Sequence, residues 1–199
     1  MKAVPFILAL FLTAATAGAS VNPYDIVVQA DGTSQTLILR TTTDVAQDTE
    51  VSIRDHRGHT LYSKSLTTGS FLNTRFALSA LPTGDYDLVI QDRIGRTTQP
   101  VRVTGAGITA DPAAARRVFF PQCDVQDGRT LRINYLNHRG QRVDIRVEDA
   151  TGREVFSDFV NGSTPVQRAY ELSRLPRGQY SVRITAKTID TYTTTFELR

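Results

Sequence analysis

The sequence predicts an all-β protein made of two tandem immunoglobulin-like antiparallel β-sandwiches, with about seven strands each. Three observations support this prediction. Apolar and polar residues alternate with a period of two along most of the chain, which is typical of strands that bury one face. Turn signals rich in Gly, Asp, Asn and Pro separate these runs at short intervals. The whole pattern also occurs twice.

The duplication can be followed residue by residue. Val51–Gly58 returns as Ile145–Gly152, and Phe76–Tyr86 returns as Tyr170–Tyr180. Both pairs of segments are separated by 94 residues, so no gap falls between them. A repeat of this length is a whole domain, because solenoid units span only about 20–50 residues.

The chain therefore divides into four predicted parts. Residues 1–19 are predicted to be a signal peptide, because Lys2 precedes an apolar stretch and Ala17-Gly-Ala19 forms a small-residue cleavage site. The rest comprises one sandwich at 20–103 (module 1), a linker at 104–117 and a second sandwich at 118–199 (module 2). We expect an exported protein that resides in the periplasm, on the cell surface or outside the cell.

Fourteen strands are expected, seven in each module. In the sixth strand of module 1, for example, Tyr86, Leu88 and Ile90 alternate with polar neighbours. The last strand of module 2 requires one extra residue of offset, which aligns 101–103 with 196–198. The expected ranges are 24–30, 36–42, 50–55, 60–66, 73–78, 85–91 and 97–103, followed by 117–122, 130–136, 141–149, 153–160, 167–172, 179–186 and 191–198.

Turns and the linker complete the pattern. Asp55–Gly58 and Asp149–Gly152 each begin with Asp and end with Gly, which indicates a type I turn closed by a left-handed glycine. In the linker, Asp111 and Pro112 could start a single helical turn.

One motif is specific enough to identify the type of sandwich. It reads Leu81-Pro-Thr-Gly-Asp-Tyr86 in module 1 and Leu175-Pro-Arg-Gly-Gln-Tyr180 in module 2. In immunoglobulin-like sandwiches, a Tyr after such a corner buries its ring and returns its hydroxyl to the backbone. We therefore expect a structural role for this corner motif, whose residues are Leu81, Pro82, Gly84, Tyr86, Leu175, Pro176, Gly178 and Tyr180.

Together with the Asp-x-x-Gly turns, this motif gives the chain a family resemblance. Asp55–Gly58 with Leu78–Tyr86, and Asp149–Gly152 with Leu172–Tyr180, resemble the C-terminal sorting domain of type IX secretion cargo and related fibronectin III-like modules of exported bacterial proteins. The resemblance implies recognition by an outer-membrane secretion machine and removal of the domain after transport. The chain departs from the family pattern in having two modules and no separate upstream cargo domain.

Several residues could carry chemistry, and each has a simpler interpretation. His56 and His59 flank a turn, but module 2 has Ala150 and Arg153 in their places, so we expect solvated turn residues and no metal site. His138 is expected to be another turn residue.

The remaining candidates are treated in the same way. Asp85 and Asp87, beside Asp92, are expected to lie on an exposed strand face without forming a calcium site. Asn161 begins a glycosylation sequon that we interpret as a turn, and Thr191–Thr195 is expected to be a polar edge strand. Cys123, the single cysteine, is expected to be a buried small apolar residue.

These patterns favour a non-enzymatic interaction or structural module of the bacterial envelope, with no cofactor and with a protein or envelope component as its partner. The net charge is +3 and the arginines are scattered, which excludes a clustered nucleic-acid surface. A secretion-sorting protein is the alternative, and a two-domain periplasmic chaperone is a further alternative. No transmembrane segment is expected in the mature chain.

Overall fold

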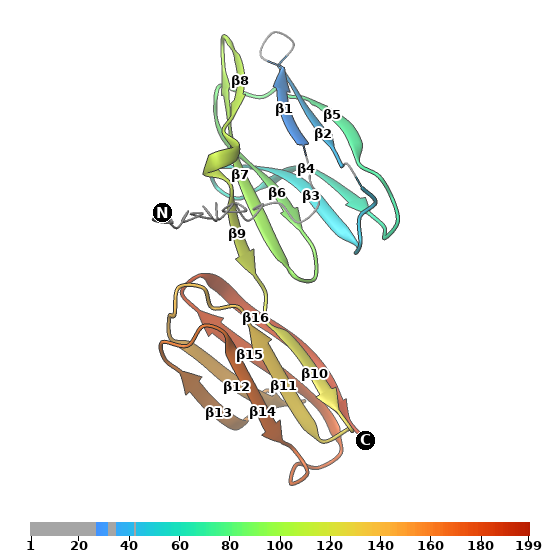
Figure 1. The fold of residues 1–199 in the computed structure, drawn as a ribbon, viewed down its shortest axis with the longest axis vertical. Helices are drawn as coiled ribbons and strands as arrows, with labels where there is room; N and C mark the ends of the chain where they lie inside the picture. The colour runs from blue at the N-terminus through green and yellow to red at the C-terminus, as the bar shows by residue number, and fades with distance from the viewer. Residues whose placement is uncertain (1–26, 32–34, 42) are drawn as a thin grey trace, which may run out of the picture.

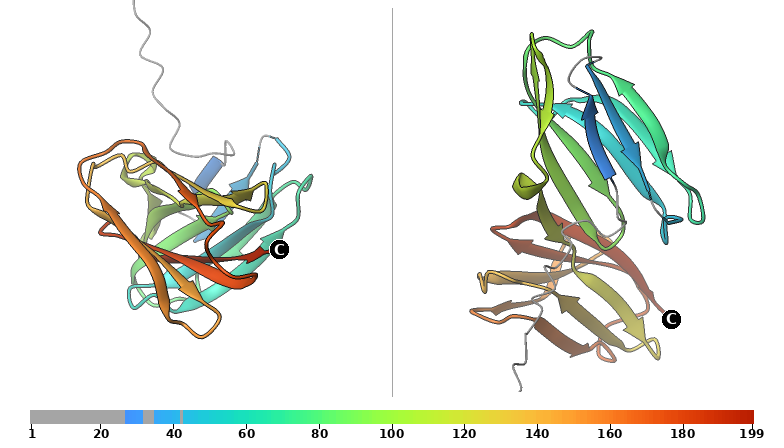
Figure 2. Two further views of the ribbon diagram at one scale, coloured as in Figure 1. Left: turned by 90° about the horizontal axis from the view of Figure 1, so that it is seen from below. Right: turned by 45° about the horizontal axis from the view of Figure 1, so that its top comes forward.

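The computed structural model describes residues 27–31, 35–41 and 43–199, and these residues form antiparallel strands with a single short 3-10 helix (Figure 1). Two β-sandwiches follow one another along the long axis of the molecule (Figures 1 and 2). The predicted fold class is therefore confirmed. The predicted signal peptide at 1–19 lies outside the described residues.

Module 1 has two facing sheets. The smaller sheet has the order β1-β2-β5, and the larger has the order β4-β3-β6-β7-β8, with β9 also paired to β7. The bounds are β1 Val27–Asp31, β2 Thr36–Arg40, β3 Thr49–Asp55, β4 Thr60–Leu66, β5 Asn73–Ala77, β6 Gly84–Gln91, β7 Gly95–Thr104, β8 Gly107–Ala110, η1 Pro112–Ala114 and β9 Arg116–Phe119.

Module 2 repeats this plan with seven strands. Its sheets have the orders β10-β11-β14 and β13-β12-β15-β16, three strands against four, which is the fibronectin III-like arrangement. The bounds are β10 Gln122–Gln126, β11 Thr130–Tyr135, β12 Val143–Asp149, β13 Glu154–Val160, β14 Val166–Glu171, β15 Gly178–Ala186 and β16 Ile189–Leu198.

Each sandwich encloses its own hydrophobic core. The fully buried side chains of module 1 include Leu37, Val51 and Leu88, and they form one cluster with the inward-facing residues of both sheets. Leu131 and Ile145 belong to a separate cluster in module 2. The period-two pattern thus places one face of a strand inside, as the alternating burial of β2 and β11 shows.

The strand registers explain the extra residue in the last strand of the repeat. Tyr86 pairs with Val101 in module 1, and Tyr180 pairs with Phe196 in module 2. The first residues of these pairs are 94 apart and the second residues 95 apart, as the sequence alignment required. The β15–β16 ladder absorbs the difference with a register shift between Ile184 and Ala186.

The segment 104–117, predicted as a linker, contains more structure than the sequence indicated. Strands β8 and β9 both pair with the outer edge of β7, β8 with its end and β9 with its beginning. Ile108 of β8 is buried in the core of module 1. Between them, Asp111 caps η1 by accepting a hydrogen bond from the Ala113 amide, as expected from the Asp-Pro pair.

The prediction of one first strand for module 2 at 117–122 was wrong. Residues up to Phe119 form β9, which extends the sheet of module 1, and module 2 starts with β10 at Gln122. Pro121 lies between the two strands and cannot donate a backbone hydrogen bond, so the ladder ends there. Gly95 allows the close approach of β9, because a Cβ at this position would lie 2.4 Å from the Val118 carbonyl oxygen.

Candidate functional site

The corner motif has the same geometry in both modules. The Tyr86 hydroxyl donates to the Pro82 carbonyl oxygen at 2.7 Å, and the Tyr180 hydroxyl donates to that of Pro176 at 2.8 Å. Both tyrosine rings are buried in their cores. Each hydroxyl therefore ties the start of one strand to the corner that precedes it.

The other corner residues support this arrangement. Leu81 and Leu175 pack, partly buried, against the cores. Their amides donate to the carbonyl oxygens of Leu78 and Leu172, which closes the turn before the corner. Gly178 has a φ of +152°, a conformation that favours glycine.

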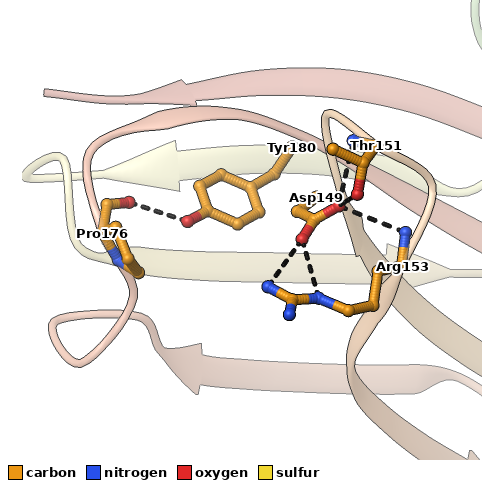
Figure 3. Close-up of polar contacts among 5 residues, drawn as sticks. All are labelled: Asp149, Thr151, Arg153, Pro176 and Tyr180. Atoms are coloured by element: carbon orange, nitrogen blue, oxygen red, sulfur yellow. Dashed lines mark hydrogen bonds and ion pairs between the residues drawn. The ribbon is translucent and has the colours of Figure 1, made fainter.

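The Asp-x-x-Gly turn lies next to the corner, because Asp149 pairs with Tyr180 across β12 and β15 (Figure 3). Its Oδ1 accepts from the Thr151 amide at 2.9 Å, the Thr151 hydroxyl at 2.6 Å and the Arg153 amide at 3.1 Å. Its Oδ2 accepts from the Arg153 guanidinium at 3.0 Å. The left-handed Gly152, with a φ of +81°, closes the turn.

These donors control the ionisation of Asp149. The Thr151 hydroxyl is the largest influence, and with the backbone and Arg153 donors it outweighs desolvation and lowers the pKa to about 2. The carboxylate is therefore ionised and occupied by donors at neutral pH. Such a group holds a turn in place and is poorly suited to act as a general base or a metal ligand.

Module 1 builds the same turn with a histidine. Asp55 pairs with Tyr86 and accepts from the amides of Arg57 and His59, each at 2.9 Å. The His59 ring lies 3.1 Å from the other carboxylate oxygen, where module 2 has an arginine. Desolvation opposes ionisation of Asp55, but the bonds from His59 and Arg57 prevail and lower its pKa.

The structure does not bring the other candidate ligands together. His59 is engaged with Asp55, and His56 is exposed beside it. Asp85 is the second residue of β6 and forms an ion pair with Arg102 at 2.7 Å, while Asp92 follows the far end of the strand. Within the described parts of the chain, no three His, Cys, Asp or Glu residues are grouped as metal ligands would be.

Cys123 lies on β10, half-buried against the core of module 2. Burial raises the pKa of its thiol to about 12, with a smaller contribution from Asp124.

Two further candidates lie in turns. Asn161 is exposed after the end of β13. Asp92 organises the β6–β7 turn, since its Oδ1 accepts from the amides of Ile94 and Gly95 at 2.6 and 2.7 Å.

Module 1 also has an apolar groove that sequence reasoning missed. It has a volume of about 290 Å³ and opens between the edge strands β4 and β5 of the two sheets. Leu61 and Tyr62 remain 46% and 40% exposed at its rim. The groove is lined by Ile53, Leu61, Tyr62, Arg75, Phe76, Ala77, Leu78 and Leu81.

The corresponding side of module 2 is more covered. Phe156 and Tyr170 pack with ring centroids 4.8 Å apart, as Tyr62 and Phe76 do in module 1 at 4.4 Å. In module 2, the Tyr170 hydroxyl also donates to Asp158 at 2.7 Å. Val155 is only partly exposed where module 1 exposes Leu61. The sequence does contain a signal of this difference. Module 2 has Asp158 and Tyr170 at the positions where module 1 has Lys64 and Phe76, and only the first pair can form this hydrogen bond.

Three solved structures illustrate what the chain is similar to. They are the BSP domain of a biofilm associated protein (11% identity, TM-score 0.30), the FN1–FN3 domains of chicken CNTN1 (9%, 0.32) and a Parabacteroides merdae β-glucuronidase (12%, 0.30). The matches cover 86%, 83% and 81% of this chain, but 29%, 61% and 27% of those structures. The chain thus spans less than two thirds of the length of each.

A comparison with curated protein sequences found no match. No helix in the described part of the chain is long and apolar enough to cross a bilayer. Residues 127–196, which include the Asp149 turn, the Tyr180 corner and most of module 2, match the family model described as "Secretion system C-terminal sorting domain". That family indicates an exported protein, and the resemblance stated from the motifs is confirmed: module 2 carries the sequence pattern of a secretion sorting domain on a fibronectin-like sandwich.

Proposed function

We propose that module 2 is a secretion-sorting module, which directs the chain through a type IX-like export machine of the bacterial envelope. The match of residues 127–196 to the sorting-domain family is the observation that supports this proposal. The corner and the turn of module 2 are structural features that module 1 shares, so the proposal depends on the family match and not on these two features.

A reporter experiment tests this proposal. An exported reporter protein carrying residues 120–199 is expressed in a bacterium that has a type IX system, and the same reporter carrying 20–119 serves as the matched control, so that β9 stays with module 1. We expect the first fusion on the cell surface or in the medium and the second in the periplasm. A folded 120–199 fusion that stays in the periplasm would contradict the sorting role.

We further propose that module 1 is a non-enzymatic interaction module of the envelope. The open groove between β4 and β5 supports this, since its rim exposes Leu61 and Tyr62. Leu61→Lys places a charge at the rim and should reduce cross-linking to envelope partners. Val155→Lys at the corresponding position of module 2 is the control. Equal cross-linking of both variants and the unmodified chain would contradict this role of the groove.

A further inference from the structure

The two modules differ in whether further strands pair with the last strand of their larger sheet. In module 1, the last strand of the sandwich is β7, and β8 and β9 cover its outer side. In module 2, the equivalent strand is β16, and it is the terminal strand of its sheet. Within the described residues, no strand pairs with the outer side of β16.

Side-chain burial follows this difference. Thr97, Gln99 and Val101 of β7 face inward and are buried beneath the covering strands. By register, the matching residues of β16 are Tyr192, Thr194 and Phe196, and all three remain half-exposed. The uncovered edge of module 2 thus combines free strand backbone with a partly exposed aromatic strip.

The composition of β16 does little to discourage pairing. Exposed edges of natural sheets are usually protected by charged side chains, prolines or bulges. The edge strands β4 and β13 do carry charges, Lys64 in the first and Asp158 in the second. The charged residues of β16, Asp190 and Glu197, flank a central stretch at 191–196, which reads Thr-Tyr-Thr-Thr-Thr-Phe and contains no charge.

We propose that β16 pairs with β16 of a second molecule of this chain, antiparallel and centred on Thr194. This register places Tyr192 opposite Phe196 of the second molecule on the inner face. On the outer face it places Thr193 opposite Thr195. Aromatic pairs and Thr–Thr pairs are favourable cross-strand neighbours in antiparallel sheets. The strand is therefore self-complementary, and the two four-stranded sheets join into one sheet with a two-fold axis.

The aromatic side chains on the inner face of β16 contact other rings of the same chain. The Tyr180 and Phe196 rings stack at 5.7 Å, and Phe120 covers Tyr192 from the side of module 1 at 6.0 Å. These contacts fix both aromatic side chains in place and leave each partly exposed. A second strand beside β16 would cover them as β8 and β9 cover the matching residues of module 1. This inference does not depend on the sorting role.

Sedimentation analysis of the purified exported chain tests the pairing. Sedimentation is measured at concentrations of about 5–500 µM, a range in which association with a Kd of about 10–100 µM is detected. The weight-average mass should rise toward twice that of one chain. A mass that stays at one chain over this range would overturn the proposal.

Charge substitutions at exposed positions test the register. Thr193→Lys with Thr195→Lys sets lysines opposite one another, and should weaken association at least tenfold. Thr193→Lys with Thr195→Glu sets opposite charges across the same pairs, and should restore association to within threefold of the unmodified chain. Ser63→Lys with Ser65→Lys on β4 is the matched control at another edge strand, and it should leave the association of the two chains unchanged. Equal effects of the two β16 variants, or no effect of either, would overturn the proposed pairing.

Discussion

The tyrosine corner makes a quantitative prediction about stability. Tyr180→Phe removes a hydroxyl that donates to the Pro176 carbonyl oxygen at 2.8 Å and leaves the buried ring in place. Pro176 is exposed, so water can replace the lost donor at its carbonyl group. The cost should therefore be the net value of one hydrogen bond, about 1 kcal/mol, without the larger penalty of an unsatisfied buried acceptor.

For a domain of this size, a loss of about 1 kcal/mol lowers the Tm by roughly 4–8 °C. The chain has no tryptophan, so urea and thermal unfolding are followed by far-UV circular dichroism and calorimetry. Tyr86→Phe makes the same change in module 1 and should have an effect of equal size there. Calorimetry should assign each loss to the transition of the altered module.

Tyr192→Phe serves as the control, because the Tyr192 hydroxyl has no hydrogen-bond partner among the described residues. It should change the free energy of unfolding by less than about 0.5 kcal/mol, as surface changes do. If Tyr180→Phe changed stability no more than Tyr192→Phe, the corner hydrogen bond would not stabilise the fold and the reasoning would be refuted.

Three further predictions concern the linker, the turn and the thiol. Gly95→Ala should displace β9 from β7, because the new Cβ would lie 2.4 Å from the Val118 carbonyl oxygen. It should lower the free energy of unfolding by about 1–3 kcal/mol and speed proteolysis within 104–117. Gly105→Ala is the control, because a Cβ at Gly105 would meet open space. The pKa of Asp149 is lowered to about 2, so the stabilising effect of its carboxylate is complete above the unfolded pKa near 3.8 and disappears as the pH falls through 2. The Tm difference between Asp149→Asn and the unmodified chain should therefore be widest at neutral pH and vanish in acid. A Tm difference that stays constant with pH would contradict this reasoning. The Cys123 thiol, with its pKa raised to about 12, should react with maleimide more than about tenfold slower in the native chain than in urea, and equal rates would show that it is not buried.

Local pattern was sufficient to predict most of the fold. Period-two alternation located 13 of the fourteen predicted strands, since strands such as β2 and β11 bury one face in the core of their own module. The Asp-x-x-Gly turns and the corner could be predicted because their bonds join residues no more than four positions apart, such as Tyr180 and Pro176. Whether each module folds independently within its predicted boundaries stays a prediction.

Features that depend on distant neighbours could not be predicted in this way. The segment 104–117 is rich in Gly, Ala and Pro, so its propensity indicated a linker, and its strands exist because β7 offers an edge to pair with. The groove depends on how side chains of β4 and β5 meet across two sheets, which no spacing in the sequence reports.

The two modules share a fold and differ in which side of it they leave open. Module 1 covers the outer side of β7 with its own following segment and opens an apolar groove beside β4. Module 2 covers the groove side with the contacts of Tyr170 and leaves the outer side of β16 unpaired among the described residues. Because the shared corner and turn hold both sandwiches in the same shape, this difference lies in edges and rims alone. We therefore predict two contact surfaces on one scaffold, and a substitution at either surface should alter one interaction and leave the other unchanged.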